Sequence, residues 1–280
     1  MKKISRRSFL AAAGLTVAAL ALTACGGSAS TASSAAASSV AASSEAASTS
    51  AAAAELTTVE AGKLTMATNA TFPPYEMTTD AGTIEGIDVD TAQAIAEKLG
   101  LELQIDDMDF DAALLSVQQG KADIAMAGIT VTDERMAVMS FSDSYATGIQ
   151  SIIVPNDSEI ASPDDLAGKK IGTQRGTTGY IYCSDDFGED SVVVYDSGLT
   201  AVQALNNGQV DAVVIDNAPA TEYVAANPGL KVLDTSYAEE DYAIGMAKGS
   251  ALEDAVNKAL EELKADGTLQ AIVDKYINAN

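Results

Sequence analysis

Two stretches of the chain share one pattern of helix, glycine, aspartate and strand. They read Ala113-Leu-Leu-Ser-Val-Gln-Gln-Gly-Lys-Ala-Asp-Ile-Ala-Met-Ala-Gly128 and Ala201-Val-Gln-Ala-Leu-Asn-Asn-Gly-Gln-Val-Asp-Ala-Val-Val-Ile-Asp216, and they align without a gap. In both stretches a glycine stands where a helix would end in a left-handed residue, and an aspartate opens an apolar strand. Helix–glycine–strand units occur in any α/β protein, but the shared spacing favours two α/β lobes of similar build.

The rest of the chain from Lys63 onward also alternates short apolar strands with amphipathic helices, which is typical of an α/β architecture. Ligands of open α/β sheets bind beyond the carboxyl ends of the strands. The first aligned unit leads to Gly128 at such an end and the second to Asp216, so these positions face each other across a cleft if the lobes do. The predicted elements outside the second unit are strands at 63–68 and 101–105 and helices at 88–99 and 112–118.

Composition excludes several classes of function. The 280 residues carry a net charge of −24, which disfavours nucleic acid because binding to phosphates depends on Lys and Arg. Histidine is absent, so the commonest general base and zinc ligand are missing. The only cysteines are Cys25 and Cys183, which rules out a disulfide framework, and we expect Cys183 to be a packed thiol. No cofactor or metal site is predicted.

The N-terminal segment is expected to direct export rather than to form part of the fold. Residues 1–24 have a basic start and an apolar stretch too short to span a membrane, as in an export signal. The end of this segment, Leu22-Thr23-Ala24-Cys25, resembles the lipobox of bacterial lipoproteins, which implies that Cys25 is lipidated. The alternative is a structural cysteine after an ordinary signal peptide. Ser5-Arg6-Arg7-Ser8-Phe9-Leu10 also resembles a twin-arginine export motif, so the export route stays open.

Residues 25–60 are predicted to form a flexible tether. This segment is almost entirely Ala, Ser and Thr and has no periodic apolar face, so it cannot bury a core. A tether behind a lipidated cysteine keeps a folded body near the outer face of the cytoplasmic membrane. We therefore expect a lipid-anchored, extracytoplasmic protein that touches the membrane only through its N-terminal lipid, such as palmitate.

Residues 63–280 resemble the periplasmic or lipoprotein amino-acid-binding proteins of ABC importers, in the glutamine, histidine and lysine/arginine family. The resemblance implies a type II periplasmic-binding-protein fold, a two-lobed Venus flytrap, with lobe 1 at 61–148 and 245–280 and lobe 2 at 149–244. The motifs that carry it occur in the family's order: Ala67-Thr-Asn-Ala-Thr-Phe-Pro-Pro-Tyr-Glu76, Glu85-Gly-Ile-Asp-Val-Asp90, Met108-Asp-Phe-Asp111, Ala127-Gly-Ile-Thr-Val-Thr-Asp-Glu-Arg135, Phe141-Ser-Asp-Ser-Tyr145, Gly176-Thr-Thr178 and Asp211-Ala-Val-Val-Ile-Asp216.

The family pattern also implies how an amino acid would be held. Arg135 is the expected partner of the α-carboxylate, because a guanidinium binds a carboxylate with two hydrogen bonds. Without the family pattern, a surface salt bridge of Arg135 to a neighbouring acid would be the simpler interpretation. Asp216 is the expected partner of the α-ammonium, and it also fits the N-cap of the next helix. The full set of predicted ligand-binding residues is Asn69, Phe72, Phe110, Ala127, Gly128, Thr130, Arg135, Thr178 and Asp216.

Departures from the family pattern bear on the ligand. Members that bind glutamine or basic amino acids often carry Asp where this chain has Asn69, so a neutral polar amino acid is expected. Arg175 would favour an acidic ligand if it points inward. Glu76 is a candidate partner for a cation, but its sequence context fits a solvated or structural carboxylate better. Phe72 and Phe110 match positions that pack on the ligand side chain, and core packing is their alternative role.

The predicted function is binding, not catalysis. The lobes close about segments near 147–152 and 241–246, and the closed form, expected to be a monomer, delivers its ligand to an ABC permease. Two alternatives are a dehydratase-like enzyme and a ligand-sensing ectodomain. The absence of histidine weakens the enzyme, and a sensor would need a separate signalling partner because none follows before Asn280.

Overall fold

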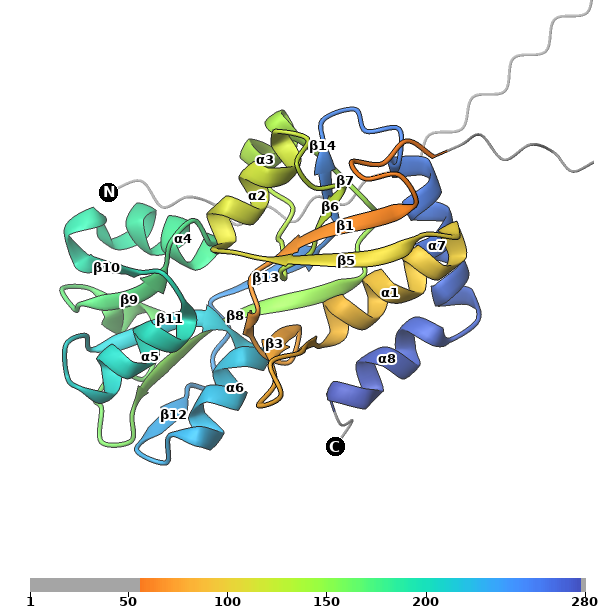
Figure 1. The fold of residues 1–280 in the computed structure, drawn as a ribbon. Coiled ribbons are helices and arrows are strands. Elements are labelled where there is room, and N and C mark those ends of the chain that lie inside the picture. The colour runs from red at the N-terminus through yellow and green to blue at the C-terminus, as the bar shows by residue number, and fades with distance from the viewer. Residues whose placement is uncertain (1–55, 278–280) are drawn as a thin grey trace, which may run out of the picture. The chain divides into compact units, whose positions relative to one another are not determined.

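The computed structural model describes residues 56–277 (Figure 1). The predicted signal peptide, Cys25 and most of the predicted tether lie outside these described residues. Between residues 56 and 277, no helix combines the length and the apolar character that crossing a membrane requires.

The first of two main sheets has five strands in the order β5-β1-β6-β14-β7. Strand β1 runs parallel to β5 and β6, while β14 runs antiparallel to β6 and β7. Figure 1 shows α1 and α2 on opposite sides of β1. The strands are β1 Lys63–Thr68, β5 Glu102–Asp107, β6 Ile124–Ala125, β7 Met139–Phe141 and β14 Gly245–Ala247; the helices that belong to this part are α1 Ile87–Leu99, α2 Phe110–Gln118, α3 Asp133–Val138, α7 Glu253–Ala265 and α8 Thr268–Tyr276.

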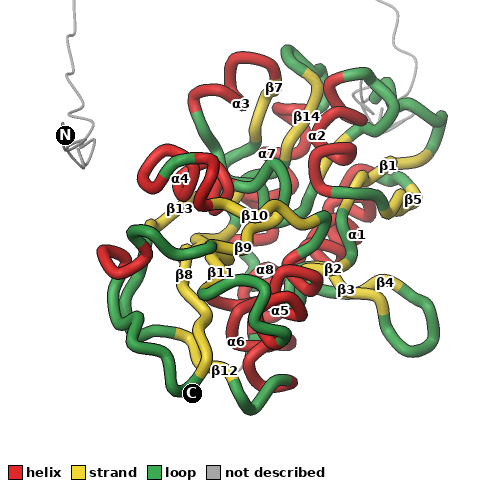
Figure 2. The backbone as a smooth tube through the Cα atoms, turned by 90° about the vertical axis from the view of Figure 1, so that its left-hand side faces the viewer, coloured by secondary structure: helices red, strands yellow, loops and turns green. Residues whose placement is uncertain are grey.

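The second main sheet follows the order β10-β9-β11-β8-β12, with β13 also paired to β8. A small hairpin sheet, β2-β3-β4, projects beside α1 in Figure 2. The strands of the second sheet are β8 Ala146–Pro155, β9 Ile171–Gln174, β10 Val192–Tyr195, β11 Ala212–Asp216, β12 Leu230–Val232 and β13 Ala238–Tyr242; its helices are α4 Thr178–Phe187, α5 Gly198–Asn206 and α6 Asn217–Ala226, with short 3-10 turns at Pro163–Leu166 and Glu189–Ser191; the hairpin strands are β2 Thr71–Phe72, β3 Glu76–Thr78 and β4 Ile84–Glu85.

Each main sheet is covered on both faces, which explains why its central strands are apolar almost throughout. Successive side chains of a strand point to opposite faces, so Leu64 and Met66 of β1 join one core cluster while Ala67 joins another. In the same way Ile152 and Ile153 of β8 enter two separate clusters of the second sheet. Cys183 is fully buried in one of them, as a free thiol.

The chain passes between the two main sheets twice, and the two crossings lie side by side. The first crossing joins β7 to β8, and the second joins β13 to β14. Strands β8 and β13 pair antiparallel, with Ala146 opposite Tyr242. The two crossings therefore form one narrow connection, and most of the remaining contacts between the sheets must come from their facing loops.

The aligned sequence stretches adopt the same local structure, as predicted. Gly120 and Gly208 follow α2 and α5 with an identical φ of 66°. Asp123 then accepts the backbone N–H of Thr65 at 2.8 Å, and Asp211 accepts that of Lys170 at 2.8 Å. Each aspartate thus fixes the start of its own strand to the neighbouring parallel strand, which is why the spacing repeats.

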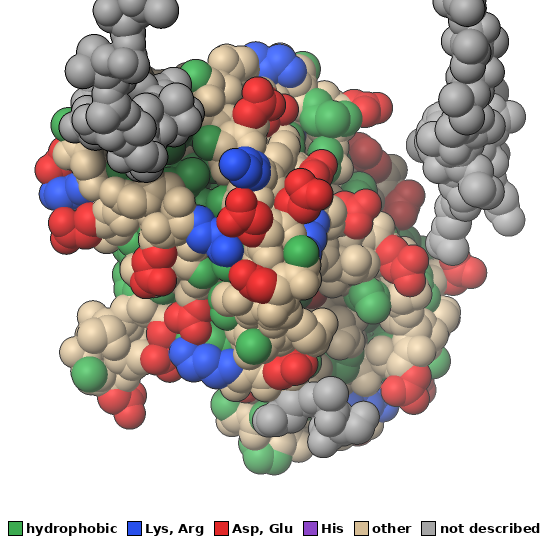
Figure 3. All heavy atoms as spheres, turned by 90° about the vertical axis from the view of Figure 1, so that its right-hand side faces the viewer, with side chains coloured by type: hydrophobic (Ala, Val, Ile, Leu, Met, Phe, Trp, Pro, Cys, Tyr) green, Lys and Arg blue, Asp and Glu red, His purple; other side chains and the backbone are tan. Residues whose placement is uncertain are grey.

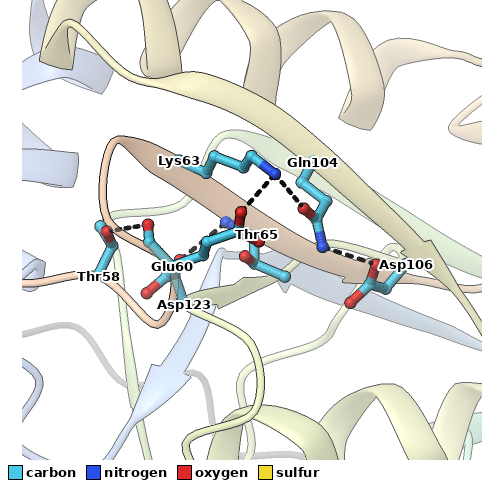
Figure 4. Close-up of polar contacts among 7 residues, drawn as sticks. All are labelled: Thr58, Glu60, Lys63, Thr65, Gln104, Asp106 and Asp123. Carbon is cyan, nitrogen blue, oxygen red and sulfur yellow. Dashed lines mark hydrogen bonds and ion pairs between the residues drawn. The ribbon is translucent and has the colours of Figure 1, made fainter.

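Asp123 accepts a second backbone hydrogen bond, which Asp211 does not. Its other oxygen accepts the backbone N–H of Val59 at 2.7 Å and so fixes the segment that leads into β1. Figure 4 shows Asp123 under this segment, where Lys63 pairs with Glu60 at 2.6 Å.

Replacing these two aspartates should therefore have unequal effects on stability. Asp123→Ala leaves two backbone N–H groups without their acceptor and should lower the free energy of unfolding by about 2–4 kcal/mol. Asp211→Ala, at the exposed equivalent position with one such bond, should cost about 1 kcal/mol. Urea unfolding of both variants measures this difference. Equal losses would contradict the role assigned to Asp123.

The surface is dominated by acidic side chains. In Figure 3, Asp and Glu are spread over the face seen and clearly outnumber Lys and Arg. This distribution agrees with the strongly negative sequence, and it gives a polyanion no basic patch on that face.

Candidate functional site: a cavity between the two main sheets

One cavity lies between the two main sheets, and every predicted ligand-binding residue lines it. The structure thus brings together positions spread over almost 150 residues of sequence, from the carboxyl ends of strands in both sheets. Its predicted lining residues are Asn69, Phe72, Phe110, Ala127, Gly128, Thr130, Arg135, Thr178 and Asp216, and sequence reasoning missed Gln150, Gln174, Thr177, Val214, Ile215 and Tyr242.

Arg135 is placed by the start of α3. Thr132 is the N-cap of this helix, and its hydroxyl accepts the Arg135 backbone N–H at 3.2 Å. The guanidinium donates to the carbonyl of Thr130 at 2.7 Å and to that of Gly176, across the cavity, at 3.0 Å. It also lies 5.4 Å from the centre of the Phe110 ring. Arg135 is thus buried at 8% exposure, so the alternative of a surface salt bridge is wrong.

The N-terminus of α4 adds donors opposite Arg135. Thr177 is the N-cap, and its hydroxyl accepts the backbone N–H of Tyr180 at 3.3 Å. The first N–H groups of a helix, here those of Thr178 and Gly179, have no acceptor within the helix. Because a helix N-terminus favours negative charge, this end and the remaining N–H groups of Arg135 form a place for a carboxylate.

Asp216 ends β11 and is almost completely buried, at 2% exposure. It is the N-cap residue of α6, but its side chain makes no capping hydrogen bond. The hydroxyl of Tyr242 donates to it instead. Burial raises the pKa of Asp216 to about 7, although the Tyr242 hydrogen bond acts in the opposite direction. A ligand ammonium would restore the ionised carboxylate.

A third part of the cavity, separate from Arg135 and from Asp216, is polar and joins the two main sheets directly. The Asn69 side-chain amide donates to the Met108 carbonyl at 2.9 Å, and its oxygen accepts from the Gln174 amide at 2.9 Å. Gln174 is the last residue of β9. The next residue, Arg175, points to solvent and pairs with Asp196 at 3.3 Å. Arg175 therefore contributes no positive charge to the cavity.

Glu76 also lines this part of the cavity and is fully buried, which excludes the solvated carboxylate among the alternatives that the sequence left open. No donor faces either of its oxygens. Burial raises the pKa of Glu76 well above its ordinary value, and the nearby Asp88 adds to the effect. A buried carboxylate without a partner is costly, so this part of the cavity favours a ligand group that brings hydrogen-bond donors or a positive charge.

The strand-end loop at Gly128 shapes one wall. Gly128 has a φ of 55°, and a Cβ there would come within 2.8 Å of the Phe72 ring, so glycine is required. Its N–H donates to Asp88 at 3.0 Å and is not free for a ligand. The Phe72 ring stacks on the Tyr75 ring with 5.8 Å between the ring centres, and the Tyr75 ring meets the Tyr242 ring edge-on with 5.3 Å between the centres. An aromatic wall thus runs from Glu76 towards Asp216.

A search against protein families matches residues 64–279 to "Bacterial extracellular solute-binding proteins, family 3". The chain belongs to this family. It is 32% identical over 225 residues to the L-cystine-binding protein TcyJ of Escherichia coli K12, covering 79% of this chain and 85% of that one. It is 33% identical over 222 residues to the ABC transporter arginine-binding protein 1 of the same organism, covering 77% and 91%.

Solved structures agree on the two-lobed, type II periplasmic-binding-protein fold. An ancestral arginine-binding protein bound to arginine is 41% identical, with a TM-score of 0.74, and the match covers 78% of this chain and 99% of that one. A structure described as an ancestral arginine-binding protein bound to glutamine matches with the same TM-score of 0.74 and 41% identity, over 77% and 98%.

The raised pKa of Asp216 predicts how the ligand-free protein responds to pH. In the folded state Asp216 holds its proton up to about pH 7, whereas in the unfolded state it loses it near pH 4. The unfolded state therefore gains relative stability as the pH rises from 4 to 7, and the free energy of unfolding falls. Asp216→Asn should remove up to about 4 kcal/mol of that fall.

The measurement is urea unfolding of both proteins at pH 4, 5.5 and 7. Asp88 and Glu76 contribute to the pH dependence of the free energy of unfolding in the same direction in the unaltered protein and in Asp216→Asn. The difference between these two proteins therefore isolates Asp216. Parallel pH curves for the two would contradict the assignment.

Proposed function

We propose that this protein binds a polar L-amino acid in the cavity between its two main sheets and delivers it to an ABC transporter permease for import. The observation that carries the proposal is that Arg135 of one lobe and Asp216 of the other line the same cavity. Arg135, with the N-terminus of α4, suits an α-carboxylate, and Asp216 suits an α-ammonium. A free amino acid presents both groups on one carbon, so it can engage the two lobes at once.

The side chain of the ligand would then point to Asn69, Gln174 and Glu76. The unpaired carboxylate suits a side chain with several N–H donors, so we propose a cationic amino acid, arginine first, in place of the neutral one expected from Asn69. The names of two relatives, arginine-binding proteins, support this choice. The glutamine complex of an ancestral relative supports an amide-bearing side chain as the second choice.

Ligand capture would work by closure of the lobes. We propose that residues 61–148 with 245–280 move against 149–244, with the bending near 147–152 and 241–246. Direct contacts across the cavity, Arg135 to Gly176 and Asn69 to Gln174, favour closure even without ligand. A ligand that contacts both lobes binds better to the closed form and shifts the population further towards it.

Thermal unfolding of the full chain carrying Cys25→Ser, against each of the twenty amino acids at ~1 mM, tests the proposal. A ligand with a Kd near 1 µM should add about 4 kcal/mol at that excess and raise the melting temperature by several degrees. Arginine is expected to give the largest shift. Arg135→Ala and Asp216→Ala should abolish the shift, because each removes one of the two groups that hold the amino-acid backbone.

Arg175→Ala is the matched control for Arg135→Ala, since Arg175 is exposed and lies outside the cavity. It should leave the ligand-induced shift intact. If no amino acid stabilises the unaltered protein, the proposed function is wrong.

We further propose that Cys25 is lipidated and holds the protein on the outer face of the cytoplasmic membrane. The lipobox-like Leu22-Thr23-Ala24-Cys25 at the end of a signal-like segment supports this. In the native bacterium, Cys25→Ser should move the protein from the membrane fraction to the soluble extracytoplasmic fraction. Cys183→Ser, which changes the other cysteine, should not, and equal membrane retention of both variants would count against the anchor.

A further inference from the structure

We infer that Glu76 and Asp88 form a proton-sharing pair that lets the cavity select between cationic and amide side chains according to pH. With a proton on the pair, the cavity accepts a neutral amide side chain. With that proton lost, it accepts a guanidinium or ammonium. The inference rests on the proposed function, because it assigns Glu76 to the side-chain end of a bound amino acid.

The backbone holds the two acids against each other. The N-terminus of α1 sits on the segment before β3, where Ile87 N–H donates to the Pro74 carbonyl at 3.0 Å and Asp88 N–H to the Tyr75 carbonyl at 2.9 Å. This docking brings Asp88 against the segment that carries Glu76, and the proximity of the two carboxyl groups adds to the raised pKa of Glu76. Two carboxylates cannot hydrogen-bond to each other unless one carries a proton.

The two acids are not equivalent. One oxygen of Asp88 accepts the Tyr145 hydroxyl at 2.7 Å, and the other accepts the Gly128 N–H at 3.0 Å. Asp88 is therefore a fully engaged acceptor, fixed between the ligand-binding loop and the first crossing between the sheets. Glu76 has no such donors, and it is the member that faces the cavity. Glu76 is thus the member that changes its protonation state.

Every other titratable group around Glu76 is an acid or a phenol. Asp107 approaches from β5, and Tyr75, Tyr145 and Tyr223 approach from the hairpin, the crossing and α6. Asp216 and Tyr242 line the same cavity from β11 and β13. The one cation of the described cavity lining, Arg135, directs two of its donors to the Thr130 and Gly176 carbonyls.

These surroundings favour a neutral Glu76 in the empty cavity. Burial raises the pKa of Glu76 well above its ordinary value. Burial also raises the pKa of Asp88, but its two donors act in the opposite direction and limit the rise to about 6. A cationic side chain supplies the missing positive charge, so its binding expels the proton to solvent. An amide side chain supplies no charge, so Glu76 keeps the proton that it shares with Asp88, and its other oxygen accepts the amide N–H.

Calorimetric titration of the full chain carrying Cys25→Ser with arginine and with glutamine, from pH 5 to 8, tests this. The ratio of the glutamine Kd to the arginine Kd should rise by about tenfold per pH unit wherever Glu76 is protonated in the ligand-free protein. The reason is that arginine binding releases the Glu76 proton and glutamine binding does not. Using a ratio cancels the titration of Asp216, since both ligands present the same α-ammonium to it.

Glu76→Gln should bind glutamine but show a ratio that does not change with pH. Glu261→Gln, an exposed position on α7, is the matched control and should keep the wild-type slope. A second measurement needs no variant at Glu76. Titration near neutral pH in two buffers of different ionisation enthalpy should show that arginine releases about one proton more than glutamine.

A ratio independent of pH, together with equal proton release, overturns the inference while leaving the proposed function intact. Failure of both ligands to bind overturns the proposed function, and the inference falls with it.

Discussion

The balance of buried charge in the cavity governs the rest of this structure. Among the described residues Arg135 is the one buried cation, whereas the buried carboxyl groups of Glu76 and Asp216 line the cavity and that of Asp88 lies directly behind Gly128 in its wall. Ionised groups removed from water need partners, and this set contains too few positive charges for all three acids to be ionised. The empty cavity must therefore hold protons on some of its acids. A zwitterion with a cationic side chain, which brings two positive charges and one negative, corrects this imbalance.

The fold distributes these charges so that neither lobe can satisfy a ligand alone. Arg135 and Glu76 belong to the part around the first sheet, whereas Asp216 ends a strand of the second. Glu240, on β13, reaches back to the Thr130 hydroxyl at 3.0 Å and to the Gln150 amide at 3.0 Å. Recognition and closure are therefore one event, because the complete set of partners exists only when the two sheets face each other.

Much of the fold could be predicted because it depends on local patterns. The repeated helix–glycine–aspartate–strand unit depends on a left-handed glycine and an aspartate that caps the neighbouring strand, and both are visible in sequence. Asp216 was found because it follows an apolar strand, and Arg135 because it belongs to a family motif at the start of a helix. Family resemblance was needed as well, since an arginine after two acids otherwise indicates a surface ion pair.

The missed features depend on tertiary packing that no short pattern reveals. Glu76 follows a Pro-Pro pair in a turn-like stretch that gives no sign of burial, and the start of α1 docks on this segment. Gln174 and Arg175 are neighbours on the strand end, and alternation sends the first into the cavity and the second to solvent. Tyr242 reaches Asp216 from a strand with an acidic, exposed-looking sequence. These side chains set the charge of the cavity and therefore the choice of ligand.

A crystal structure of the protein with arginine tests the central claim most directly. We predict the α-carboxylate on Arg135 and the N-terminus of α4, the α-ammonium on Asp216, and the guanidinium against Glu76 with its carboxylate ionised. An arginine bound in the reverse orientation, or one whose guanidinium points away from Glu76, would contradict the account of how buried charge selects the ligand.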